Sequence, residues 1–274
     1  MQFPEINESV LRLSVFLAVF AVMAVAEALL PKRELVTPKG PRWLTNLGIV
    51  VIGSFVIRLM AALAVPLAAV AVAAVAERNG WGLLNHVAWP AWTEVLVAVV
   101  VLDFAIWFQH LASHKVPLLW RLHQMHHADR DIDVTTAIRF HPIEIGLSML
   151  WKIVCVLALG ASPEAVLLFE IILNGLAMFN HANVALPARL DAALRLLVVT
   201  PDMHRVHHSV IRREHDSNYG FNLSIWDRML GTYTPQPRDG HHGMTIGLAE
   251  YQSDQPGRLW WCLALPFRRR SGGA

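Results

Sequence analysis

The sequence predicts an all-α integral membrane protein built as a bundle of apolar helices. Hydrophobic residues make up 55% of its 274 residues and charged residues only 16%, whereas soluble globular domains carry about 25% charged residues. Mean hydropathy is +0.42, and several apolar runs are long enough to cross a hydrocarbon layer of about 30 Å. The net charge of +2 does not indicate nucleic-acid binding, so no nucleic-acid partner is expected.

The first expected span covers residues 13–30. Glu27 is its only charged residue, and we expect it to pair with Lys32 or Arg33 at the membrane surface. The N-terminus does not resemble a cleaved signal peptide, because its first residues are acidic rather than basic. The loop that follows, PKRELVTPKGPRW, carries four basic residues, which places it on the cytoplasmic side.

The second apolar run covers residues 44–76, which is longer than one span needs and too short for two. We expect one span broken near Pro66, with the remainder bent or lying at the far interface. Residues 77–91 then form an outer loop in which His86 stands alone. The third span, residues 92–109, returns the chain to the cytoplasmic side.

An apolar hairpin follows further along the chain. Residues 143–159 and 163–179 are joined by Gly160-Ala161-Ser162, which predicts two helices that cross the membrane and return. The tail RLWWCLALPFRRR is too short to span, and it suits an interfacial anchor. Cys155 and Cys262 lie far apart in apolar runs, so they are expected to be small buried hydrophobic residues rather than a disulfide or a metal site.

Histidines are concentrated where these segments meet the cytoplasmic face. They occur as H-x-x-x-H and H-x-x-H-H patterns, which place imidazoles on one face of a helix, and one further histidine follows the hairpin. The nine candidate metal ligands are His110, His114, His123, His126, His127, His181, His204, His207 and His208.

A metal site is the simplest explanation of this concentration. Nine buried imidazoles near lipid need partners, and metal ligation supplies them together. Imidazole suits zinc, copper and iron, and nine ligands exceed what one ion can use, which predicts a dimetal site. Asp103 lies two helical turns below His110, and we expect its carboxylate to orient His110 or a neighbour, with pairing to Arg58 as the alternative.

The remaining histidines are not expected to bind metal. His141 precedes a proline at a predicted helix start, so it either supports a ligand or is structural. His215, His241 and His242 lie in charged or glycine-flanked loops and are expected at the surface.

These motifs, in this order, resemble the fatty acid hydroxylase/sterol desaturase superfamily. The resemblance covers residues 92–233 and also includes Asn180-His181 and the segments Asn218-Tyr219-Gly220, Trp226-Asp227-Arg228 and Gly231-Thr232-Tyr233. It implies an integral membrane enzyme with a non-haem di-iron centre of two iron ions, using O₂ as co-substrate on a fatty acyl, sterol, carotenoid or ether lipid. Asn180 and Asp103 are the candidate catalytic residues beside the ligands.

The sequence departs from the family at one position, since some relatives carry a further histidine where this chain has Ala185. Without a fused cytochrome domain, electrons are expected from a separate reductase, ferredoxin or cytochrome. We divide the chain into an N-terminal transmembrane region (1–91), a catalytic domain (92–233) and an interfacial tail (234–274). The expected location is a bacterial inner membrane, with the site facing the cytoplasm.

Several alternatives stay open from the sequence. A zinc-dependent lipid hydrolase would need an acidic base, for which Asp129 and Asp202 are available. A non-enzymatic metal carrier would spread its ligands through the depth of the bilayer. Hydroxylation is slightly favoured over desaturation because it needs only one hydrogen abstraction followed by oxygen rebound. Substrate and oligomeric state are undetermined.

Overall fold

The computed structural model describes residues 7–63 and 69–268, and the regular secondary structure of these residues is helical apart from three isolated β-bridges. The longer helices are α1 Glu8–Leu29, α2 Lys39–Leu63, α3 Ala69–Asn79, α4 Ala91–Lys115, α5 Pro117–His127, α6 Pro142–Leu159 and α7 Pro163–His181. The short helices are α8 Ala188–Leu194, α9 Pro201–His207, α10 Arg212–His215, α11 Ile225–Met229, α12 Gly240–Gly243 and α13 Leu259–Ala264. Single 3₁₀ turns are η1 Leu83–His86, η2 Thr136–Ile138, η3 Ala249–Tyr251, η4 Gln255–Gly257 and η5 Leu265–Phe267.

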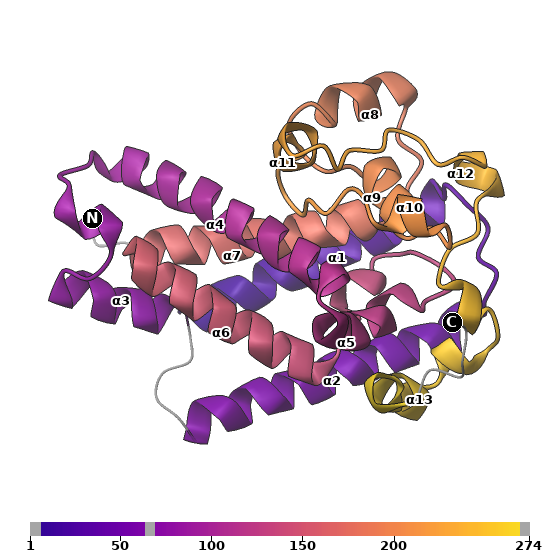
Figure 1. Ribbon diagram of the computed structural model, residues 1–274, viewed down its shortest axis with the longest axis horizontal. Coiled ribbons are helices and arrows are strands. Elements are labelled where there is room, and N and C mark those ends of the chain that lie inside the picture. The colour runs from indigo at the N-terminus through magenta and orange to yellow at the C-terminus, as the bar shows by residue number, and fades with distance from the viewer. Residues whose placement is uncertain (1–6, 64–68, 269–274) are drawn as a thin grey trace.

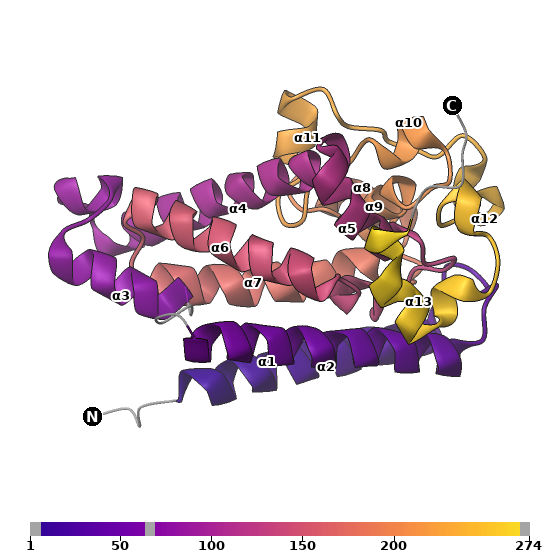
Figure 2. The same cartoon turned by 60° about the horizontal axis from the view of Figure 1, so that its bottom comes forward.

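Five helices, α1, α2, α4, α6 and α7, are long and apolar enough to cross a membrane. They run along the long axis of the molecule, and the short helices α8 to α13 gather at one end (Figure 1). Figure 2 shows three layers, with α1 and α2 on one side, α6 and α7 in the middle and α4 on the other side. The all-α membrane bundle predicted from the sequence is therefore confirmed. The predicted break near Pro66 falls in residues 64–68, outside the described residues.

The α6–α7 hairpin has the predicted local structure. Gly160 ends α6 in the left-handed conformation at φ 71°, and the Ser162 side chain accepts a hydrogen bond from Ala165 N at the start of α7. Glu94 of α4 accepts from both the backbone N–H and the hydroxyl of Ser162. Gly82 packs so closely that an added Cβ would clash with the Gly160 backbone. This end of the bundle is therefore held tightly, and the hairpin returns α7 to the end that carries the histidines.

At the opposite end, α1 and α2 fix the loop between α5 and α6 through buried polar groups. Arg42 of α2 donates to Asp129 and Asp133. Glu27 of α1 accepts from the backbone N–H of Val134 at 2.6 Å and of Asn183 at 2.9 Å. The expected pairing of Glu27 with the basic loop is wrong, because its carboxylate is satisfied by backbone donors instead.

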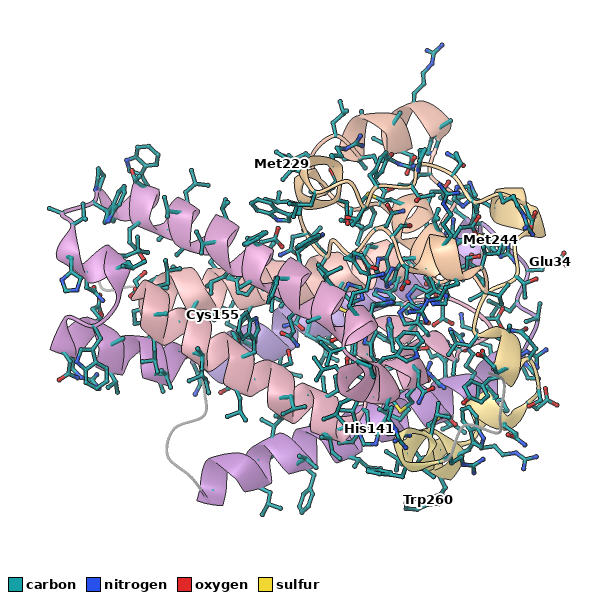
Figure 3. The ribbon with its side chains drawn as sticks, viewed as in Figure 1. Glu34, His141, Cys155, Met229, Met244 and Trp260 are labelled. Atoms are coloured by element: carbon teal, nitrogen blue, oxygen red, sulfur yellow. The ribbon has the colours of Figure 1, made fainter. Side chains whose placement is uncertain are left out.

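The C-terminal tail packs against α2 and α5. Trp261 and Cys262 of α13 are buried in a cluster with Ile49, Trp120 and Met125. Trp260 is 76% exposed and points outward at the edge of the molecule (Figure 3). The tail thus combines a buried face with an outward-facing tryptophan, an arrangement suited to a membrane interface.

Candidate metal centre

The nine predicted histidines come together from four separate segments at one end of the bundle. Each is at most 4% exposed, and nitrogen-bearing side chains crowd where α4, α5 and α9 meet (Figure 3). They form two groups that could each hold a metal ion, with ligand atoms within 4.8 Å of one another in each group. The first group is His110, His114, His123, His127 and His207, and the second group is His126, His181, His204 and His208.

Helix periodicity explains how the segments divide between the groups. His110 and His114 are four residues apart on α4, and His123 and His127 are four residues apart on α5, so each pair shares a helix face. His126 lies about 100° around α5 from its neighbour His127, and it therefore reaches the second group. Each group contains residues from both α5 and the α9 region, so the two candidate ion positions are adjacent.

Backbone and carboxylate oxygens fix the tautomer of five of these histidines. Nδ1 of His110 lies 2.7 Å from Tyr219 O, and Nδ1 of His207 lies 2.6 Å from Ser217 O. Nδ1 of His123 meets Glu144 Oε1 at 2.6 Å. Nδ1 of His126 and of His181 meet the carbonyl oxygens of Arg139 and Ala177 in the same way. Because these oxygens can only accept, each Nδ1 is the protonated nitrogen and each Nε2 carries a lone pair.

The Nε2 atoms then face one another with no proton between them. His110 and His123 approach Nε2 to Nε2 at 3.2 Å, His207 and His110 at 3.0 Å, and His181 and His126 at 3.2 Å. Both nitrogens of His114 and of His208 are buried and have no hydrogen-bond partner among the described residues, although Asp216 Oδ1 lies 3.5 Å from His114 Nδ1. Lone pairs that converge in a buried site repel unless a cation lies between them, so the donor set fits metal ions in both groups.

Burial keeps the imidazoles in the form that binds cations. Desolvation lowers the pKa of His126, His127, His204, His207 and His208 well below the ordinary histidine value, and the neighbouring histidines lower it further. These five side chains, which we call the α5/α9 histidines, are therefore neutral at pH 7. A neutral imidazole is the form that metals bind.

Asp103 does not lie against the histidines. Its carboxylate accepts from the backbone N–H of Leu223 at 3.1 Å and from Trp226 Nε1 at 2.8 Å, and it forms no ion pair with Arg58 among the described residues. The expectation that Asp103 orients His110 is corrected, because that role falls to the Tyr219 carbonyl. Asp103 instead holds the loop of residues 219–226, which supplies this carbonyl.

Asn180 also acts on that loop. Its Nδ2 donates to Phe221 O at 2.8 Å, and its Oδ1 is buried without a partner among the described residues. Asp227 accepts four hydrogen bonds, two of them from the backbone N–H groups of Tyr219 and Gly220. The segment around residues 218–228 therefore forms a hydrogen-bonded loop in which the Tyr219 carbonyl contacts His110.

Glu144 is a residue that the sequence interpretation missed. It stands in the first turn of α6, three residues after His141, where an acidic side chain ordinarily complements the helix dipole. Here it accepts from His123 instead. The pattern H-P-x-E directly after the histidine-rich helix was the available indication.

The histidines outside the two groups differ from the prediction in which of them are buried. His141 is structural, since it caps α6 by accepting from Ile143 N. His215 and His241 are buried, at 4% and 9% exposure, so their expected surface position is wrong. The ring of His215 stacks on Trp120 beside the first group. Nε2 of His241 lies 3.7 Å from Oδ2 of Asp202. His86 and His242 are exposed as expected.

Ala185, where some relatives carry another histidine, lies in an extended segment whose N–H donates to Leu30 O. The second group has four histidines and the first has five. An open position in a ligand set is where a small co-substrate can bind.

An apolar cavity of about 280 Å³ adjoins the first group. His110 and His123 line it at the metal end, and its walls come from α1, α2, α4, α6, α7 and the loop after α5. Apolar side chains dominate these walls, among them Phe16, Val50, Ile106, Ile138, Phe140, Ile145, Met149, Leu173 and Phe221. Such a cavity accepts an apolar chain or ring rather than a charged metabolite.

The sequence is similar to a protein family and to individual lipid hydroxylases and monooxygenases. The sequence profile of the fatty acid hydroxylase family matches residues 95–232, about half of the chain. An ornithine lipid hydroxylase from Rhizobium tropici is 31% identical over 184 residues, covering 66% of this chain and 53% of the relative. An alkylglycerol monooxygenase from Xenopus tropicalis is 35% identical over 164 residues, covering 60% of this chain and 35% of the relative.

A cholesterol 25-hydroxylase from Rattus norvegicus is 26% identical over 147 residues, covering 53% of this chain and 48% of the relative. The chain thus spans about half or less of the length of each of these relatives. No solved structure matches it significantly.

Proposed function

Because the chain belongs to the fatty acid hydroxylase family, we propose that it hydroxylates a C–H bond of a membrane lipid with O₂ and two electrons. The balanced reaction is RH + O₂ + 2e⁻ + 2H⁺ → ROH + H₂O. The observation that carries the proposal is the contact of the apolar cavity with His110 and His123 of the first group. Part of the cavity wall is therefore formed by candidate metal ligands.

The two histidine groups would hold two iron ions, one in each group. When bound, iron supplies the activation of O₂ that attack on an unactivated C–H bond requires. The protein's own part is to hold neutral imidazoles in fixed tautomers, through the oxygens of Tyr219, Ser217, Arg139, Ala177 and Glu144. Such neighbours set ligand orientation and basicity.

The cavity would bind and orient the lipid. Its apolar lining excludes water from the reacting carbon, which limits side reactions. Its polar and charged lining residues include Gln109, Ser113, Glu144, Ser148, Lys152 and Asn174, and they could contact a polar group of the substrate. Fatty acyl, sterol, carotenoid and ether lipids remain candidates, and desaturation would require removal of a second hydrogen in place of oxygen transfer.

Asp103 and Asn180 are proposed as positioning residues, because the side chains of both hydrogen-bond to the loop of residues 219–226 and, among the described residues, neither hydrogen-bonds to a candidate ligand. We keep residues 92–233 as the proposed catalytic region, residues 1–91 as the transmembrane region and residues 234–274 as the tail. α1 and α2 contribute Phe16 and Val50 to the cavity.

We propose a bacterial inner membrane with the histidine end facing the cytoplasm. The positive-inside rule supports this orientation through the loop between α1 and α2. Further basic residues at the same end, Lys115, Arg121, Arg130 and Arg213, support it independently. Electrons would then come from a separate cytoplasmic donor.

The alternatives receive less support. Asp129 is paired with Arg42, and Asp202 with Lys32 and Arg205. Although burial acts to raise the pKa of Asp202, Arg205 and Lys32 outweigh it and lower that pKa, which makes Asp202 a poor general base for a hydrolase. A metal carrier is disfavoured because the candidate ligands gather at one end of the bundle.

The proposal is tested by isotope labelling. Iron-loaded protein in lipid nanodiscs is supplied with ¹⁸O₂ and a chemical reductant, and lipids are analysed by mass spectrometry. We expect a lipid that gains one ¹⁸O atom, and no gain in His126→Ala protein. A lipid that loses two hydrogens without gaining oxygen would assign desaturation. Turnover that is independent of O₂ and depends on zinc would overturn the proposal.

A further inference from the structure

A second cavity, of about 580 Å³, reaches the first histidine group from another side. His114 and Trp120 lie in its wall, together with Pro117, Gln124 and Tyr251. His110 and His123 line the lipid cavity, whereas His114 lines this one and is absent from the lipid cavity. The first group is thus approached by two cavities that share none of its histidines.

The second cavity is strongly basic. Lys115, Arg121, Arg212 and Arg268 line it, and none of its lining residues in the described part of the chain is acidic. Asp216 binds Lys115 at 3.0 Å and Arg212 at 2.9 Å and so balances part of this charge, and its Oδ1 lies 3.5 Å from Nδ1 of His114. Arg121 is held in place by the carbonyl oxygens of Pro266 and Arg268. A basic concave surface of this kind concentrates anionic partners and repels free metal cations.

Aromatic rings connect this cavity to the candidate ligands. The ring of Trp120 lies 5.1 Å from His114 and 5.7 Å from His127 between centroids, and both histidines belong to the first group. His215 stacks on the same tryptophan at 5.6 Å, and Arg212 lies over it on the cavity side. The Trp120 ring in the cavity wall therefore lies beside two candidate ligands of one ion, and one of them, His114, also lines the cavity.

We propose that this basic cavity is the docking site of an acidic one-electron carrier protein. The inference rests on the proposed function, which consumes two electrons per lipid and so needs two encounters, each oxidising one carrier by one electron. Charge complementarity would steer the carrier to the cavity, where the side chains of Trp120 and His114 lie in the wall. Lipid and electrons would then reach the first group from separate directions.

Binding is measured first, so that the test does not depend on turnover. Metal-free protein in nanodiscs of uncharged lipid is titrated with an acidic plant-type ferredoxin by isothermal calorimetry. The Arg212→Glu/Arg268→Glu variant should bind on the order of 10-fold more weakly than wild type at low salt, because both rim charges are reversed. The exposed Arg189→Glu, on α8 and outside the cavity lining, is the matched control and should leave the affinity unchanged.

Turnover then separates this inference from the proposed function. Iron-loaded variant protein should lose ferredoxin-driven turnover and keep turnover driven by reduced methyl viologen, a small cation that does not require the basic docking surface. Turnover that fails with methyl viologen in wild type would count against the proposed function itself. Equal ferredoxin affinity in wild type and the rim variant would overturn the docking site. Loss of binding to phosphatidylglycerol vesicles without any change in ferredoxin affinity would instead assign the basic surface to the membrane.

Discussion

The bond between Glu144 and His123 gives the sharpest test of how the first group is built. Glu144→Ala would leave Nδ1–H of His123 without its acceptor at 2.6 Å and free the ring to change tautomer. Loss of such an orienting partner costs about 10–100-fold in metal affinity, and each 10-fold equals about 1.4 kcal/mol. The acceptor here is a buried carboxylate, so we expect Glu144→Ala to weaken iron binding in the first group about 100-fold. Glu144→Gln keeps an acceptor oxygen without the charge, and we expect it to weaken iron binding about 10-fold.

The assay is anaerobic iron(II) titration against chelators of graded strength. His123 belongs only to the first group, so one of two ions should be released early while the other keeps its wild-type affinity. Glu164→Gln removes an exposed acidic side chain from the first turn of α7 and serves as the control. Wild-type affinity for both ions in Glu144→Ala protein would refute the assignment of His123 as an oriented ligand.

Three further predictions concern stability. His141→Ala should retain both metals and lower the free energy of unfolding by about 1–2 kcal/mol, because it removes the cap of α6 and the hydrogen bond that His141 Nε2 donates to Leu263 O; metal analysis showing a lost ion would contradict this. Gly82→Ala should destabilise the protein by about 1–3 kcal/mol in thermal denaturation, because the φ of 90° at this position is strained for alanine and the added Cβ would meet Gly160. The control is Gly53→Ala, which should not destabilise the protein because the space around Gly53 is open. Metal-free protein should lose stability as the pH falls below about 6.5, because burial lowers the pKa of the α5/α9 histidines and the unfolded chain therefore binds more protons. Each titrating histidine contributes about 1.4 kcal/mol per pH unit, and denaturation midpoints that stay constant from about pH 7 to about pH 5 would exclude this linkage.

The sequence predicted the features that depend on local pattern. Apolar length identifies α1, α4, α6 and α7, and the glycine and serine between α6 and α7 mark a tight turn. The nine histidines could be predicted to converge because spacing places them on helix faces and topology returns those helices to one end of the bundle.

What could not be predicted depends on the three-dimensional path of the chain. The carbonyl oxygens of Tyr219 and Ser217 orient His110 and His207, and a backbone oxygen leaves no trace in the sequence. Helix periodicity places Asp103 on the same face of α4 as His110, but its carboxylate accepts hydrogen bonds from the loop of residues 219–226 instead. His215 lies in a charged segment, and only packing against Trp120 reveals that it is buried.

The central claim is that two separate histidine groups hold two metal ions. Iron is loaded anaerobically into wild-type protein and into His207→Ala and His204→Ala proteins, one variant for each group, and bound metal per folded chain is measured by mass spectrometry after gel filtration. We expect two ions in wild type and one in each single variant. One ion in wild type, or two ions retained in both variants, would contradict the claim.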